Sequence, residues 1–148
     1  MKKFKSNVSQ FTLSKIQTDF PKVKITNSSE SAEFIRQFYA DDIEIFESFF
    51  ILLLNQANNT IGFAKISQGG IAGTVVDLRI IAKYAVDALA TSVILAHNHP
   101  TGNLRPSPAD RSTTEKAKRG LEILDIKVLD HIILSADKHF SFADEGLI

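Results

Sequence analysis

The sequence contains no cysteine, and neither sign of charge is in excess. Without cysteine there are no disulfides, no thiolate nucleophiles and no sulfur ligands for a metal. Seventeen Lys and Arg residues balance seventeen Asp and Glu residues. No field of the whole molecule would therefore draw it to nucleic acid or to an anionic membrane. A metal site in this protein must use nitrogen and oxygen ligands, and a nucleic-acid partner would need a local patch.

Long hydrophobic runs are also absent. The longest, from Phe49 to Leu54, has six residues, whereas a helix needs about 20 to cross a bilayer. The first twenty residues begin with positive charge but lack the apolar stretch of a signal peptide. These observations predict a soluble, cytoplasmic protein with no membrane partner.

The length of 148 residues fits one compact domain, which can bury roughly two-thirds of the surface of its unfolded chain. No linker, repeat or low-complexity tract divides the sequence. We expect a single domain over residues 1–148, with its core at about 40–148 and an N-terminal extension and helix at about 1–40.

The first half of the sequence predicts a helix followed by a β-hairpin. Asn27 and Glu30 have the spacing of a capping box, and apolar residues recur at helical spacing after them, which predicts a helix at about 28–40. Residues 43–55 are apolar with little polar relief, as in a strand covered on both faces. A polar stretch, in which Asn58 and Asn59 suit left-handed turn positions, joins it to a second strand at 61–67.

The second half predicts two further helices and the remaining strands. After a glycine-bearing loop at 68–73, Asp77 is a suitable N-cap for a helix at 78–90. Ser107 as N-cap with Pro108 at the first helical position predicts a helix that ends near Leu124. The predicted strands of this half cover residues 91–96, 127–135 and 139–142. The order of elements predicts an α+β fold, a sheet flanked by helices.

The residues that can carry chemistry follow the strand at 91–96. In an extended chain, His97 and His99 direct their imidazoles to the same side. Asp110 comes eleven residues after His99, in the first turn of a predicted helix, and supplies an oxygen ligand. Three protein ligands with one open position are typical of catalytic zinc, whereas structural zinc is normally closed by four ligands. The pattern predicts a Zn²⁺ site built by His97, His99 and Asp110.

A hydrolase with such a site also needs a carboxylate that accepts and returns the proton of the attacking water. Glu44 and Glu47 both precede the apolar strand, and spacing alone does not choose between them. Ser107 is a further candidate, because its hydroxyl can cap the helix or donate to the oxyanion formed during attack on a carbonyl.

A glutamate followed far downstream by HNHP and then by S-x-x-D resembles the JAMM motif of the JAB/MPN metallopeptidases. The whole run HNHPTGNLRPSPAD resembles the RadC branch of that family. The resemblance extends in order and spacing over about residues 40–148. It is carried by ESFFILLLN, ISQGGIAGTVVDLR, ILAHNHP, LDHIIL and FSFADEGLI. It implies a three-layer-like, cytidine-deaminase-like mixed β-sheet flanked by helices.

The resemblance also implies roles for individual residues. Zinc ligands are expected at His97, His99 and Asp110, the catalytic general acid/base at Glu47 and a supporting catalytic hydroxyl at Ser107. The implied activity is zinc-dependent hydrolysis of a peptide or isopeptide bond, with a protein or peptide as substrate. Thr101 departs from the pattern, which usually has Ser there, but it keeps a hydroxyl.

Two other functions compete with this reading. The RadC name carries an association with DNA repair, but RadC proteins have a helix-hairpin-helix region for which we expect no room here, as in short stand-alone relatives. Nucleic acid is therefore a partner only through that association. The other alternative is a non-catalytic MPN binding module, and homo-oligomerisation through a sheet edge stays open. Asp130 and His131, on a late apolar strand, are expected to support the site by hydrogen bonds and not to bind metal.

Overall fold

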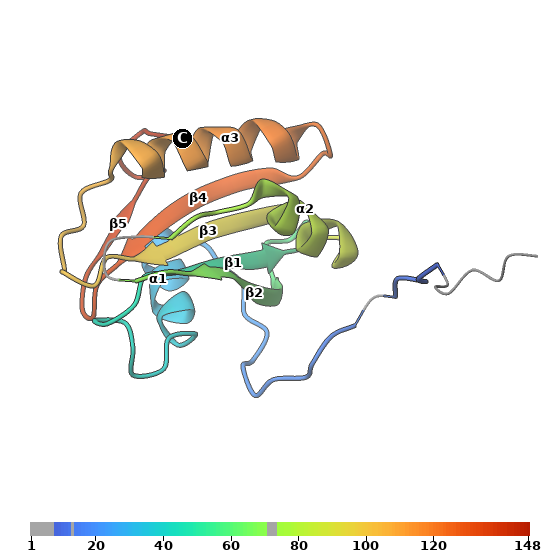
Figure 1. Cartoon of the computed structure of the whole chain (residues 1–148), viewed down its shortest axis with the longest axis horizontal. Coiled ribbons are helices and arrows are strands. Elements are labelled where there is room, and N and C mark those ends of the chain that lie inside the picture. The colour runs from blue at the N-terminus through green and yellow to red at the C-terminus, as the bar shows by residue number, and fades with distance from the viewer. Residues whose placement is uncertain (1–7, 13, 71–73) are drawn as a thin grey trace, which may run out of the picture.

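The computed structural model describes residues 8–12, 14–70 and 74–148 and contains one mixed sheet with helices on both faces (Figure 1). The strands run in the order β2-β1-β3-β4-β5, and the β3/β4 pair is parallel while the other neighbours are antiparallel. The helices are α1 (Ser28–Arg36), α2 (Leu78–Asp87) and α3 (Pro108–Glu122). The strands are β1 (Ser48–Leu54), β2 (Thr60–Gln68), β3 (Ser92–Asn98), β4 (Lys127–Leu134) and β5 (His139–Ser141). This confirms the predicted α+β fold.

Strand β1 shows why the apolar run has almost no polar relief. Every residue of β1 is buried, and successive side chains enter opposite layers of the core. Phe49, Ile51 and Leu53 pack against the layer of α2 and α3, while the alternate residues pack against the layer of α1. A strand covered on both faces needs apolar residues at consecutive positions, as the sequence had indicated. The strand is shorter than the predicted 43–55, however, because β1 begins only at Ser48.

The crossover from β3 through α3 to β4 places the functional segment at one end of the sheet. Parallel strands need such a crossover connection. The chain leaves the carboxyl end of β3 at Asn98 and returns as α3, which begins at Pro108. Strand β3 ends two residues later than predicted, so His97 lies within the sheet and not in the loop after it.

Several predicted element ends were wrong for local reasons. Helix α1 ends at Arg36 and not near 40. Asn27 caps α1 as predicted, but the carboxylate of Glu30 accepts bonds from the backbone and hydroxyl of Thr26, so the reciprocal capping box is not formed. Helix α2 ends at Asp87 instead of 90, because Leu89 takes a left-handed conformation with φ 52°.

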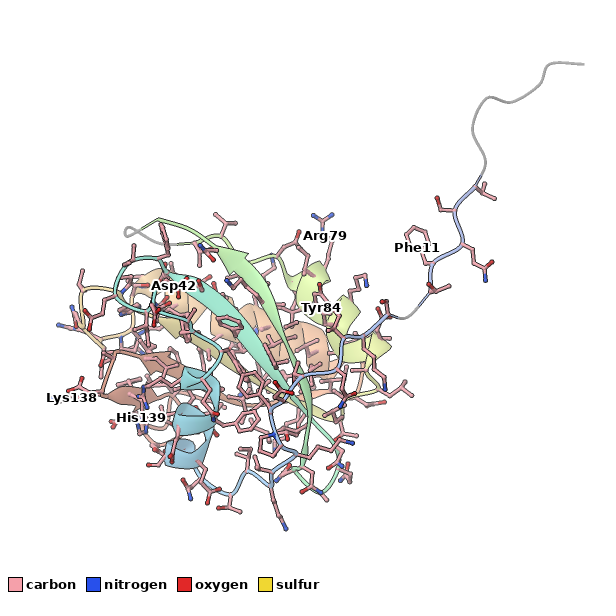
Figure 2. The ribbon with its side chains drawn as sticks, turned by 90° about the horizontal axis from the view of Figure 1, so that it is seen from below. Phe11, Asp42, Arg79, Tyr84, Lys138 and His139 are labelled. Atoms are coloured by element: carbon pink, nitrogen blue, oxygen red, sulfur yellow. The ribbon has the colours of Figure 1, made fainter. Side chains whose placement is uncertain are left out.

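The turn between β1 and β2 agrees only in part with the prediction. Asn58 has φ 61°, as predicted, but Asn59 is not in the left-handed region. The predicted loop at 68–73 lies partly outside the described residues, since 71–73 are not among them. The N-terminal segment that carries Phe11 runs away from the body of the protein (Figure 2), and Phe11 is 91% exposed. No helix in the described parts of the chain has the length and apolar character needed to cross a bilayer.

Candidate metal centre

Strand β3 and the turn that follows it bring two imidazoles together. His97 is buried in β3 opposite Phe49 of β1, and the two rings are stacked with their centroids 5.9 Å apart. His99 follows the strand, and its backbone N–H donates to the carbonyl of Leu134. The Nε2 atoms of the two histidines are 2.9 Å apart. The two rings therefore face one point, as the H-x-H spacing predicts for an extended chain.

The first turn of α3 adds a carboxylate to this point. Asp110 Oδ1 is 3.2 Å from His97 Nε2, and Asp110 Oδ2 is 3.2 Å from His99 Nε2. The same carboxylate accepts the backbone N–H of Ser107, while the Ser107 hydroxyl accepts that of Asp110, which completes a capping box. The cap fixes the rotamer of Asp110 and so directs its carboxylate toward the histidines.

The spacing of these three groups fits a tetrahedral cation. Two ligands that lie about 2.0–2.1 Å from zinc at a tetrahedral angle are about 3.3 Å from each other. The two Nε2 atoms are 2.9 Å apart, and each is 3.2 Å from a different oxygen of the Asp110 carboxylate. Two imidazole nitrogens and a carboxylate oxygen are also ligand types that zinc accepts. The donor set could hold a metal ion with little rearrangement.

Glu47 lies beside these three ligand candidates, directly before β1. Its Oε1 is 3.8 Å from His97 Nε2 and 3.9 Å from His99 Nε2. Among the described residues, Glu47, His97 and His99 form a group whose ligand atoms all lie within 4.8 Å of one another. Glu44, the alternative that the sequence left open, is exposed on the same segment. The geometry thus brings Glu47 to the centre and leaves Glu44 at the surface.

The electrostatics of the two carboxylates differ. Burial raises the pKa of Glu47, and the nearby His97 and His99 offset only part of that effect. Burial also opposes ionisation of Asp110, but the contacts of its carboxylate with the imidazoles of His97 and His99 outweigh burial and hold the pKa of that carboxyl well below its ordinary value. Two carboxylates at one site therefore have opposite tendencies, one to hold a proton and one to stay charged, which is typical of functional sites.

The centre opens onto a pocket of about 750 Å³. Its walls include Glu47, His99, Ser107 and Asp110, together with the end of β2 at Ser67 and Gln68. His97 lies beneath them with 2% of its side chain exposed, whereas His99 has 17% exposed. A molecule in the pocket could reach the acidic and hydroxyl groups directly.

The sequence analysis missed the role of Asn98, which lies between the two histidines and is fully buried. Its Oδ1 accepts the backbone N–H of Ser48, and its Nδ2 donates to the carbonyls of Ile43 and Phe46. These bonds attach the segment that carries Glu47 to β3. Adjacent strand residues point to opposite faces, so the side chain between two histidines could have been expected to serve the other face, but not to contact this segment.

We expect Asn98→Ala to lower the free energy of unfolding by about 2–4 kcal/mol, because it leaves buried backbone donors and acceptors without partners. Chemical denaturation of the variant and the wild type measures the difference. Asn103→Ala, at an exposed position, is the matched control and should change stability by less than about 0.5 kcal/mol. Equal stabilities for the two variants would show that the Asn98 bonds do not hold the segment.

The remaining sequence-predicted residues lie at different distances from the centre. His131, on β4, is fully buried and contacts His97 through a ring-to-ring hydrogen bond of 2.8 Å. Asp130 accepts bonds from the Ser141 hydroxyl and from the backbone of His131 and Ala143, so it anchors the end of the chain. The fourth histidine, His139, to which the sequence analysis assigned no role, lies on β5 next to Lys138 (Figure 2).

Fold and site together define a protein of the JAB type. Residues 25–147 match the family model described as "RadC-like JAB domain", and the chain therefore belongs to the RadC-like JAB domain family. This confirms the resemblance seen in the sequence.

Three relatives illustrate how much of the chain is shared. It is 46% identical over 129 residues to a UPF0758 protein of Flavobacterium johnsoniae and 40% identical over 125 residues to one of Porphyromonas gingivalis. It is 41% identical over 102 residues to the UPF0758 protein YfjY of Escherichia coli. These matches cover 87%, 84% and 69% of this chain, but 56%, 54% and 64% of the relatives. The chain thus spans little more than half the length of the first two.

Proposed function

We propose that this protein is a zinc-dependent hydrolase that cleaves a peptide or isopeptide bond. In this proposal His97, His99 and Asp110 hold the metal, Glu47 is the general acid/base, and Ser107 assists at the carbonyl. The single observation that supports it best is the convergence of two imidazole Nε2 atoms, 2.9 Å apart, on the Asp110 carboxylate, which places one oxygen 3.2 Å from each of them. The buried carboxylate of Glu47 lies less than 4 Å from both imidazoles. Membership of the JAB family supports the same chemistry.

The three ligands would hold the cation with one position left toward the pocket. When bound there, zinc acts as a Lewis acid and makes water acidic enough to attack at neutral pH. His99 donates its Nδ1 proton to the Asn103 carbonyl, which leaves its Nε2 lone pair directed to the centre. Asp110 remains ionised because its pKa is low.

Glu47 is placed to transfer protons between water and the leaving group. It lines the pocket, and burial raises the pKa of its carboxyl toward the range in which one group can both take and return a proton. It would accept the proton of the attacking water and deliver it to the departing amine. Proton transfer to a substrate requires access to the pocket. Glu47 has that access, whereas His97 is too deeply buried to serve as the general acid/base.

The hydroxyl of Ser107 completes the arrangement. It accepts the backbone N–H of Asp110, and a hydroxyl that accepts one bond still has its proton to donate. From the pocket wall that proton can stabilise the negative oxygen that develops when the carbonyl is attacked. The N-cap role, which the structure shows, and the catalytic role are therefore compatible in one side chain.

Metal analysis combined with a cleavage screen tests this proposal. The purified protein should contain about one zinc ion per chain, cleave members of a peptide and isopeptide library, and lose that activity with a chelator until zinc is returned. Cleavage that persists after complete removal of metal would contradict the proposal. So would a zinc-loaded protein that cleaves no amide bond in the library.

A further inference from the structure

A row of buried hydrogen bonds connects His97 to helix α3, starting from Nδ1, the ring nitrogen that faces away from the proposed metal position. His97 Nδ1 is 2.8 Å from His131 Nε2, and His131 Nδ1 is 2.6 Å from the hydroxyl of Thr114. That hydroxyl is 2.7 Å from the backbone carbonyl of Asp110, one turn earlier in α3. All three side chains are at most 2% exposed. The row therefore joins two of the proposed ligands through two residues that cannot reach the metal themselves.

The direction of these bonds follows from where the protons can be. A backbone carbonyl has no proton, so Thr114 must donate to Asp110. A hydroxyl has a single proton, so Thr114 can only accept from His131, whose Nδ1 therefore carries hydrogen. A neutral imidazole has one donor and one acceptor nitrogen, so with its hydrogen on Nδ1 toward Thr114, His131 presents Nε2 to His97 as the acceptor. Its Nε2 then accepts from His97 Nδ1.

Two features of the fold hold His131 in this row. The register between β3 and β4 shifts between Val93 and Ile94, and beyond the shift His131 pairs with Leu95. Such a bulge reverses which side chains face each side of a sheet, and here it puts His131 on the face of His97. The ring of His131 is also stacked on Phe142, with centroids 4.8 Å apart.

We infer that His131 and Thr114 are positioning residues that hold His97 as the tautomer protonated on Nδ1, with the lone pair of Nε2 directed to the metal centre. The inference rests on the proposed function for its consequence, metal binding, but the tautomer is a property of the metal-free protein. A ligand histidine commonly donates the N–H of its second ring nitrogen to a carboxylate or carbonyl. Here another histidine takes that place, and its own orientation depends on a threonine hydroxyl.

The test compares Thr114→Val, which removes the hydroxyl at nearly constant shape, with Thr114→Ser, which keeps it. Long-range nitrogen–proton NMR correlations of the metal-free protein, at about pH 8 where an ordinary histidine is neutral, report the tautomer of each ring. The wild type and Thr114→Ser should show His97 with its proton on Nδ1. Thr114→Val should show a substantial Nε2-protonated fraction, and its zinc affinity should be about 10–100-fold weaker.

The outcomes separate this inference from the proposed function. An Nε2-protonated His97 in the wild type, or a tautomer unchanged in Thr114→Val, would overturn the inference whether or not zinc binds. The expected tautomers in a protein that binds no zinc would support the inference and reject the proposed function. Thermal unfolding of both variants checks that they fold. Weaker zinc binding by Thr114→Val with an unchanged His97 tautomer would mean that Thr114 acts only through packing, and this result would also overturn the inference.

Discussion

Asp110→Asn should weaken zinc binding by at least about a hundredfold, the upper end of what loss of a supporting residue costs. The asparagine side chain keeps an oxygen that can accept the Ser107 N–H, so the start of α3 is preserved. What is lost is the negative charge, which in the wild type contacts both His97 and His99. Competition with a chromophoric chelator measures the affinity. His97→Ala should have an effect at least as large.

An exposed aspartate provides the matched control for this prediction. Asp87 lies on α2, where it pairs with Lys83 at the surface, and Asp87→Asn should leave the zinc affinity unchanged. Both variants change the net charge by the same amount, so a general electrostatic effect would weaken binding in both. If Asp110→Asn binds zinc as tightly as the wild type, Asp110 is not a ligand, and its carboxylate serves only to cap α3.

Glu47→Gln should reduce turnover by about 10²–10⁴-fold, the usual contribution of a general acid/base, while zinc stays bound. The amide has nearly the shape of the carboxylate but cannot accept the proton of the attacking water. The measurements are kcat on a peptide found in the cleavage screen and the zinc content of the same preparation. Separate readouts are needed, because Glu47 lies close enough to both histidines to be a ligand.

Glu44→Gln tests whether the effect is specific to one carboxylate. Glu44 is three residues earlier on the same segment and is exposed, so its variant should retain full turnover. Retained turnover in Glu47→Gln would reject the assigned role. Loss of zinc together with turnover in Glu47→Gln would instead make Glu47 a metal ligand and leave the general base unassigned.

Local sequence signals predicted most of the fold. The continuous apolar run of β1, the caps at Asp77 and Ser107, and the proline after Ser107 act within a few residues, and the structure confirms the elements that they predicted. Element ends were less well predicted. Helix α2, for example, ends where Leu89 takes a left-handed conformation, and no feature of the sequence predicts that conformation for a leucine. Local patterns specify where an element forms better than where it stops.

The candidate site, like the fold, was predicted from the sequence only in part. The spacing in HNHP indicated that two imidazoles would face one side, and the cap at Ser107 placed Asp110 in a first helical turn. The sequence could not choose Glu47 over Glu44 without the family resemblance, because that choice depends on how the segment before β1 is attached to Asn98. It also could not show that Thr114, one turn after Asp110, would contact His131.

The sequence by itself determined the chemical inventory: no sulfur, balanced charge, two histidines in one extended segment and a carboxylate at a helix start. These follow from residue identity and from interactions over one or two turns of chain. Only the tertiary structure decided which groups meet. The β3/β4 register and the crossover into α3 bring together residues far apart in the chain, and that pairing depends on the burial of whole elements and not on any short pattern.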